Sequence, residues 1–271
     1  MPLPGRRRVH HTRFCVIISL FMPIHTRNEF MQTRFWAIGD THLSFGKPKE
    51  MARFGNRWTN HPQDIAEAWK SRVAPEDVVL VAGDVSWAQS SNKVLPDLDW
   101  LGPLPGRKVL LRGNHDHWWK DIDNVRKIVG PRGFYALEGD SITLDGVIIC
   151  GAMGHLAPED PYFVNDVKKD RYTRELNRLE QALKHANEHR QPGQPVLLMM
   201  HYPPFTSEGK PTAYVDLITQ YQPTVCVYGH LHRHTEWDVA CNGVYNGVYY
   251  MLVAADYLEM APRLIWPMNI G

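Results

Sequence analysis

The sequence predicts an α/β fold, because short apolar runs alternate with stretches of helical character from Arg34 onward. A short apolar run without polar alternation is typical of a strand buried on both faces of a parallel sheet. Polar residues follow several runs directly, at the place where α/β sheets bind ligands. The predicted strands are residues 35–38, 78–82, 108–111, 147–150, 196–200, 224–228 and 249–254.

Three stretches between these runs have the features of helices. Residues 63–73 follow Pro62, and proline is favoured in the first turn of a helix. Residues 118–129 form the second stretch, with Trp118 and Trp119 expected to open the helix and pack in or beside the core. Residues 171–189 are the clearest case, because apolar side chains recur there three and four residues apart. These are Leu176, Leu179, Leu183 and Ala186.

One domain, residues 31–271, is expected, because the 271-residue chain has neither an internal repeat nor a low-complexity linker. Its 44% hydrophobic content supplies a core, and its 22% charged content is ordinary for a soluble protein, so disorder is not the expected main state. Organised sequence begins at Thr33, just after Met31. Residues 1–30 are therefore expected to be a disordered extension or a mis-assigned start.

The N-terminal region imitates a signal peptide, because an arginine triplet at residues 6–8 precedes an apolar run at residues 14–24. The run is too short to span a bilayer, and no small-x-small cleavage site follows it. The four cysteines, at positions 15, 150, 226 and 241, form no C-x-x-C pair, which is typical of reduced thiols. We therefore expect a cytoplasmic protein with no membrane association.

The charge distribution argues against a polyanionic partner. The whole chain has a formal net charge of +1, but residues 1–30 contribute +4 through five arginines and one glutamate, which leaves −3 for the rest. A mildly acidic body offers no long basic groove for DNA or RNA. A small phosphorylated substrate is the better match, and the sequence does not indicate an oligomeric state.

Five short motifs place polar side chains at the ends of predicted strands. The carboxyl ends of parallel strands meet at one edge of a sheet, so these side chains are expected to lie together. The glycine that precedes the polar residue in four of them lets the backbone turn sharply beside the site. The motifs are Gly39-Asp40-Thr41-His42, Gly83-Asp84, Gly113-Asn114-His115-Asp116, His201-Tyr202 and Gly229-His230-Leu231-His232.

The side chains in these motifs are suited to metal binding. In an extended chain, Asp40 and His42 point to the same side, and so do His230 and His232, because each pair is two residues apart. Carboxylate, imidazole and amide ligands suit divalent Mn, Fe, Zn or Co better than an all-oxygen calcium site. No thiolate is present in the motifs, which excludes the usual structural zinc site.

The ordered series D-x-H, G-D, G-N-H-D, H and G-H-x-H, from Asp40 to His232, resembles the calcineurin-like metallophosphoesterases. The resemblance implies a four-layer α-β-β-α sandwich, with residues 31–271 as the catalytic domain. The overall pattern is similar to bacterial predicted phosphohydrolases and, more loosely, to the cyclic-nucleotide phosphodiesterase branch. Trp87 departs from the many relatives that have aspartate there, and the Asp-Arg-Gly continuation of Ser/Thr protein phosphatases is missing.

The resemblance also implies a centre of two divalent metal ions. Two ions with two carboxylates leave about +2, a charge that attracts phosphate and lowers the pKa of a bridging water. The implied reaction is hydrolysis of a phosphomonoester or phosphodiester by a metal-bridging hydroxide that attacks phosphorus in line. Asp40, His42 and His232 are assigned to the first ion, Asn114, His201 and His230 to the second, and Asp84 to both.

Three further residues are expected to act on the substrate. By the same resemblance, His115 contacts the phosphate and protonates the leaving oxygen, while Asp116 orients the ring of His115 and raises its pKa. Asn114 also lies next to the bound phosphate. Arg112 either adds a guanidinium to the phosphate or is an ordinary surface residue.

Two other functions remain open at this point, a scaffold of the same fold without catalysis and a nuclease. The complete ligand set and His115 argue against the scaffold. The formal net charge of −3 on residues 31–271 argues against the nuclease. Residues 151–167 form a long loop that either caps the site or simply connects two elements. His61 is expected to be a solvated surface residue.

Overall fold

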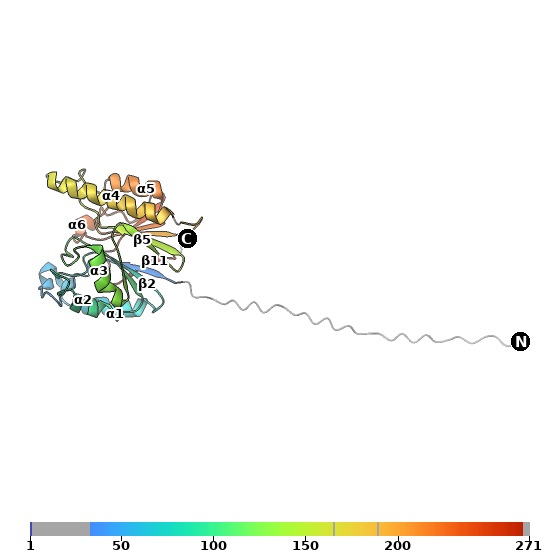
Figure 1. Ribbon diagram of the computed structural model, residues 1–271, viewed down its shortest axis with the longest axis horizontal. Coiled ribbons are helices and arrows are strands. Elements are labelled where there is room, and N and C mark those ends of the chain that lie inside the picture. The colour runs from blue at the N-terminus through green and yellow to red at the C-terminus, as the bar shows by residue number, and fades with distance from the viewer. Residues whose placement is uncertain (2–32, 165, 189, 268–271) are drawn as a thin grey trace. The chain divides into compact units, whose positions relative to one another are not determined.

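The structure is a computed structural model that describes Met1 and residues 33–267, except for residues 165 and 189 (Figure 1). The extension or mis-assigned start predicted at residues 1–30 therefore lies outside the described residues, apart from Met1. Within the described part of the chain, no helix is both long and apolar enough to cross a bilayer.

Residues 33–267 contain two sheets of five and six strands. The first has the order β11-β1-β2-β3-β4, and the second has the order β5-β6-β7-β8-β10-β9. Strands β1 to β4 pair in parallel in the first sheet, as do β6, β7, β8 and β10 in the second. The strands are β1 (Phe35–Ile38), β2 (Val78–Ala82), β3 (Arg107–Leu111), β4 (Phe134–Leu137), β5 (Asp140–Leu144), β6 (Val147–Ala152), β7 (Val196–Met200), β8 (Val225–Tyr228), β9 (Gly243–Tyr245), β10 (Val248–Leu252) and β11 (Arg263–Trp266).

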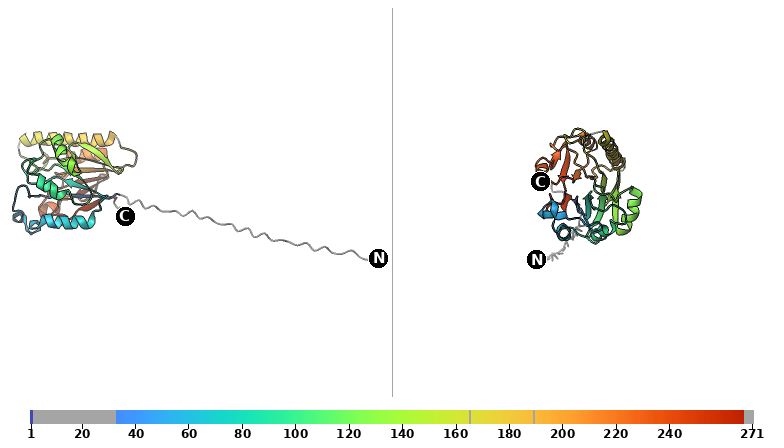
Figure 2. Two further views of the ribbon diagram at one scale, coloured as in Figure 1. Left: turned by 60° about the horizontal axis from the view of Figure 1, so that its bottom comes forward. Right: turned by 90° about the vertical axis from the view of Figure 1, so that its left-hand side faces the viewer.

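Helices cover the outer face of each sheet. In Figure 1, α4 and α5 lie on one side of the strands and α1 and α2 on the other, and Figure 2 shows the same layers from two further directions. The α-helices are α1 (His61–Arg72), α2 (Leu95–Leu101), α3 (Ile122–Val129), α4 (Asp166–Glu188), α5 (Ala213–Tyr221) and α6 (His234–Trp237). Three short 3-10 helices are η1 (Met51–Phe54), η2 (Asn56–Trp58) and η3 (Gly130–Arg132).

Alternate residues of each strand face different cores, because successive side chains point to opposite faces of a sheet. In β2, Val79 and Val81 pack against α1, α2 and α3, whereas Leu80 and Ala82 face the other sheet. A third core lies between the six-stranded sheet and helices α4 and α5. These three cores separate four layers, so the predicted α-β-β-α sandwich is confirmed.

All seven predicted strands are present, each within two residues of its predicted ends. The prediction that Trp118 opens a helix is wrong, because α3 begins at Ile122, where the Asp121 carboxylate accepts a hydrogen bond from the backbone N–H of Asn124. Trp118 and Trp119 are nevertheless fully buried, as expected of core residues. The loop after β6 ends earlier than predicted, since α4 already begins at Asp166.

Candidate metal centre and substrate cavities

The carboxyl ends of strands from both sheets converge on one site. The five-stranded sheet supplies Asp40 and His42 after β1, Asp84 after β2 and Asn114 after β3. The six-stranded sheet supplies His201 after β7 and the pair His230 and His232 after β8. The structure therefore brings together all the side chains that the sequence analysis assigns to metal ions, although they span almost two hundred residues of sequence.

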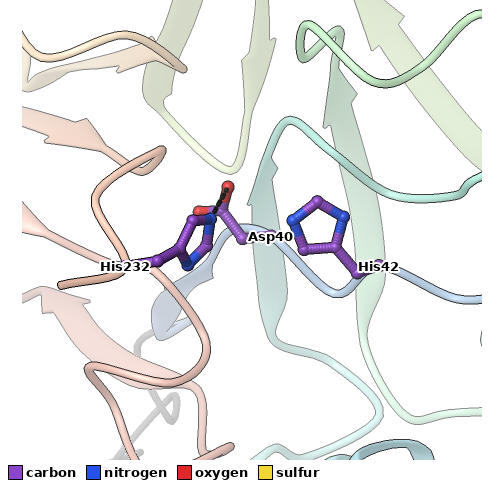
Figure 3. Close-up of side chains that lie close together, drawn as sticks. All are labelled: Asp40, His42 and His232. Atoms are coloured by element: carbon purple, nitrogen blue, oxygen red, sulfur yellow. Dashed lines mark ion pairs between the residues drawn. The ribbon is translucent and has the colours of Figure 1, made fainter. Parts of the chain in front are cut away.

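One group of possible ligands consists of Asp40, His42 and His232, whose ligand atoms all lie within 4.8 Å of one another. The His232 Nε2 atom is 3.6 Å from Asp40 Oδ1. Figure 3 shows the His42 ring on the other side of Asp40, so the three side chains face a common space. This is the set that the resemblance assigns to the first ion.

A second group consists of Asp40, Asp84 and His201. The Nε2 atom of His201 is 3.5 Å from Asp84 Oδ2 and 2.7 Å from Asn114 Oδ1. The ring of His230 packs edge-on against that of His201, with centroids 5.1 Å apart. Asp84 Oδ2 also lies 3.8 Å from His42 Nε2, so this carboxylate stands between the two groups, as a bridging ligand would.

The backbone at the ligands adopts unfavourable conformations. Asp40, His42, Asp84 and His230 have positive φ angles of 56°, 45°, 51° and 73°. Such left-handed conformations cost non-glycine residues about 1–3 kcal/mol each, and they persist only where the surrounding structure enforces them. Four of the seven candidate ligands therefore have a strained backbone. The free energy of folding offsets this cost and holds their side chains in the orientation of the site.

Two glycines allow the loops to approach the carboxylates. A Cβ atom on Gly113 would overlap the Oδ1 and N atoms of Asp84, and a Cβ atom on Gly229 would overlap Oδ2 of Asp40. The gap left by Gly113 lets the His115 N–H donate to Asp84 Oδ1 at 2.7 Å. The gap left by Gly229 lets the His230 N–H donate to both oxygens of Asp40, at 3.0 and 3.2 Å.

The ionisation of these groups fits a divalent cation. Burial raises the pKa of Asp84 to about 7, although nearby His201 lowers it, so the carboxylate lacks a sufficient positive partner. Burial also lowers the pKa values of His42 and His230 well below their usual range, and a neutral imidazole is the form that binds metal. The buried Nδ1 atom of His42 has no hydrogen-bond partner among the described residues.

Asp256, just after β10, orients one of the ligands and was not singled out from the sequence. Both of its carboxylate oxygens lie 3.1 Å from His232 Nδ1, which turns Nε2 of that ring toward Asp40. Burial lowers the pKa of His232, but the hydrogen bonds with Asp256 and Asp40 outweigh it and raise the pKa to about 11. The position of Asp256 two residues beyond a predicted strand was the available signal.

An aromatic cavity opens beside the ligands. It has a volume of about 320 Å³, and its lining includes Met51, Phe54, Trp58, Trp87 and His115 together with His42, Asp84, His230 and His232. The ring of Trp87 stacks on His42 with centroids 4.7 Å apart and lies 4.4 Å from the ring of His115. Trp87, the residue that departs from the family pattern, therefore forms part of the wall.

His115 lines this cavity, but its ionisation differs from the prediction. Burial, and secondarily the positive charge of Lys49, lowers the pKa of His115 to about 4, so the ring is neutral at pH 7. The expectation that Asp116 raises this pKa is wrong. The Asp116 carboxylate instead accepts hydrogen bonds from the backbone N–H groups of Val85, Ser86 and Gly113 and from the Trp118 indole, and so joins the loops after β2 and β3.

A second cavity, of about 450 Å³, lies on the Asn114 side of the centre. Arg112 lines it, and the buried Nε atom of Arg112 has no hydrogen-bond partner among the described residues. Met153 and His155 belong to the loop after β6, which therefore reaches the edge of the site. The remaining lining residues are Asn114, His117, Arg171, Arg174, Glu175, Arg178 and Tyr202.

The prediction that His61 is a solvated surface residue is wrong, because its relative exposure is only 3%. Its Nδ1 atom lies 3.0 Å from the Trp58 carbonyl oxygen, and its Nε2 atom lies 3.3 Å from the carbonyl oxygen of the candidate ligand His42. His61 therefore connects the η2 segment to the metal-binding loop. Tertiary contacts, rather than its position at the start of a helix, determine its burial.

Comparisons with known proteins identify a family for this chain. A protein-family model described as calcineurin-like phosphoesterase matches residues 33–234, well over half of the 271-residue chain. The Gene 66 protein of Mycobacterium phage L5 is 28% identical over 142 residues, which cover 51% of this chain and 68% of the phage protein. The Gene 66 protein of Mycobacterium phage D29 is 37% identical over 81 residues, which cover 30% of this chain and only 39% of that protein.

Among solved structures, a protein of unknown function from Aquifex aeolicus, AQ665, is similar with a TM-score of 0.47 and 18% sequence identity. The similarity covers 86% of this chain and 95% of the Aquifex protein.

Proposed function

Because the chain belongs to the calcineurin-like phosphoesterase family, we propose that it hydrolyses a phosphate ester at a centre of two divalent metal ions. The observation that carries the proposal is the meeting of two buried carboxylates with four imidazoles and one amide between the carboxyl edges of two sheets. Mn, Fe, Zn or Co suits this mixture of ligands.

Asp40, His42 and His232 would hold one ion, and Asn114, His201 and His230 the other. Asp84 lies within 4 Å of a ring on each side, which suits it to bridge the two ions. When bound, the ions would supply Lewis acidity toward the phosphate and lower the pKa of a water molecule between them.

We propose that His115 acts on the leaving group. It is not one of the candidate ligands, and its ring faces the aromatic cavity beside them. The neutral ring has one N–H group that can donate to a phosphate or leaving oxygen, and the negative charge of a bound phosphate would raise its pKa. We assign His115 to phosphate contact and to proton donation.

The substrate is proposed to be a small phosphorylated molecule. The aromatic cavity has the size of a small-molecule site and combines apolar walls with a few polar groups, which suits an apolar or aromatic leaving group. Arg112 lines the other cavity, where its guanidinium can contact an anionic group of the substrate.

Asp84→Ala tests the proposal most directly. The variant should lose metal-dependent hydrolysis of nitrophenyl phosphate and of bis-nitrophenyl phosphate, because it lacks the carboxylate that would hold both ions. Elemental analysis should show less bound metal than in the wild type, and circular dichroism should be unchanged. The pair of substrates also distinguishes monoester from diester hydrolysis.

Asp123→Ala is the matched control, since Asp123 is an exposed aspartate of α3. It should retain full activity and metal content. The proposal fails if the wild type binds no divalent ion after Mn is supplied, or if hydrolysis continues unchanged after chelation.

A further inference from the structure

The cavity on the Asn114 side of the centre is rich in arginine. Arg112 enters it from the end of β3, and Arg171, Arg174 and Arg178 enter it from α4. These three helical residues are spaced by three and four positions, so they lie on one face of the helix. Asn114 belongs to the same lining, which makes the cavity continuous with the proposed metal centre.

The charges of these arginines are compensated to different degrees. Arg178 pairs with Glu175 at 2.6 Å and with Glu138 at 3.1 Å, so its charge is balanced within the fold. Arg171 and Arg174 form neither an ion pair nor a side-chain hydrogen bond with any described residue. The buried Nε atom of Arg112 also has no hydrogen-bond partner among the described residues. Glu175 is buried in the same lining, where it pairs with Arg178 and interacts electrostatically with Arg112. Arg171 and Arg174 are therefore the two arginines of the cavity without an ion pair in the described part of the chain.

Unpaired arginines on an exposed helix are common by themselves, and Arg171 and Arg174 are exposed, but both also belong to the lining of a cavity. They line a concave cavity of about 450 Å³ instead of a convex surface. Four arginines and one carboxylate, Glu175, line the cavity, which leaves an excess of positive charge. A concave site with such an excess concentrates its field and attracts ions of the opposite sign. The buried, unpartnered Nε atom of Arg112 is a second and independent indication, because buried polar atoms normally have a partner.

We propose that this cavity binds a second phosphate group of the substrate, so that the enzyme acts on small bisphosphates. The inference rests on the proposed function, since Asn114 would join the subsite to the phosphate that is cleaved. Phosphate is preferred over carboxylate because several arginines can donate bidentate hydrogen bonds to its oxygens at once. The −3 charge of residues 31–271 conceals this local concentration of positive charge.

The test compares fructose 1,6-bisphosphate with fructose 6-phosphate. The double substitution Arg171→Ala and Arg174→Ala should lower the ratio of kcat/KM for the bisphosphate to that for the monophosphate by about 10- to 100-fold, the range expected for losing hydrogen bonds to a charged group. The matched control is Lys169→Ala with Lys184→Ala, which removes the same charge from exposed positions of α4 that do not line the cavity. It should leave the ratio unchanged.

Calorimetric titration with fructose 1,6-bisphosphate provides a measurement that does not depend on turnover. Weaker binding in the arginine variant than in the lysine variant supports the subsite even if neither fructose ester is hydrolysed. The proposed function is tested separately, by nitrophenyl ester hydrolysis and metal content, so the two failures can be distinguished. The subsite is overturned if both double variants change binding equally, or if the arginine variant loses both esters equally. It is also overturned if wild type binds a single-stranded oligonucleotide more tightly than the bisphosphate, because the cavity would then be part of a nucleic-acid surface.

Discussion

The two sheets contribute different chemistry to the centre. The edge of the five-stranded sheet supplies both carboxylates, which are buried, with Asp40 at 0% and Asp84 at 1% relative exposure. The edge of the six-stranded sheet supplies three imidazoles, of which His201 is fully buried, whereas the side chain of His232 is 34% exposed. One edge therefore supplies the buried negative charge that attracts cations, while the other supplies only imidazoles.

Each edge also fixes the side chains of the other. The backbone N–H of His230 donates to the Asp40 carboxylate, and the His201 Nδ1 atom lies 3.1 Å from the Ala82 carbonyl oxygen at the end of β2. The core between the sheets, with residues such as Leu80 and Met199, sets the distance across which these contacts form. The contacts between the two sheets therefore position the ligands of the centre. A substitution at either edge should move ligand side chains on both.

His115→Ala should have the largest effect among changes that leave the ligands intact. Hydrolysis of alkyl phosphates should slow by about 10²- to 10⁴-fold, because their leaving oxygen needs a proton. Nitrophenyl phosphate should be affected less, since its leaving group is stable as an anion. Steady-state kinetics with both esters measures the difference, and bound metal should remain at the wild-type level.

His234→Ala serves as the control, because His234 is exposed and adjoins the ligand motif without belonging to it. It should have little effect on either ester. An equal loss on both esters in His115→Ala would indicate phosphate binding without proton donation, and unchanged rates would remove His115 from the mechanism.

Gly113→Ala tests how precisely the carboxyl edge of the five-stranded sheet has to be positioned for catalysis. The added methyl group would overlap Asp84, so the carboxylate has to move, and a displacement of about 1 Å in an active site costs on the order of 10²-fold in rate. Gly130→Ala is the control, because a Cβ atom there has no neighbour within 4 Å. Comparable kcat values for the two variants would show that the close approach at Gly113 has no catalytic importance.

Strands buried on both faces could be predicted from the sequence because each is a continuous apolar run. The sequence analysis missed β4, β5, β9 and β11. Strand β5 was missed because most of its residues are only partly buried and the segment contains Asp140, Ser141 and Thr143. The end of α3 was predicted correctly, but its start was not, since two tryptophans in a turn extend the apolar pattern toward the N-terminus. Local patterns do not distinguish a buried turn from a buried helical end.

The candidate ligands were predictable because they follow predicted strands directly. The roles of Asp116 and Asp256 were not, because both depend on contacts with residues distant in the sequence, such as Ser86 and His232. The arginine cavity was missed for another reason. Net charge averages over the whole surface, and only the packing of α4 on β5 and β6 brings Arg174 into one cavity with Arg112, which follows β3.

Asp256→Asn should have the smallest effect, because it alters the support of a ligand and not the ligand itself. The amide keeps the size of the side chain but loses the charge that holds the His232 ring by its Nδ1 atom. Loss of such a supporting carboxylate typically weakens metal binding by about 10- to 100-fold. Metal titration should show this loss, whereas kcat at saturating metal should stay close to the wild-type value.

Asp256→Asn has two opposing effects on metal affinity, so the direction of the measured change shows which effect is larger. Asp256 also raises the proton affinity of His232, and a proton on Nε2 competes with the metal ion. If orientation dominates, Asp256→Asn binds metal more weakly than the wild type, while Asp99→Asn, at an exposed aspartate paired with Arg132, does not. Tighter binding in Asp256→Asn would show that proton competition dominates. The metal affinity of His232 would then be set by the charge of Asp256 and not by the orientation of its ring.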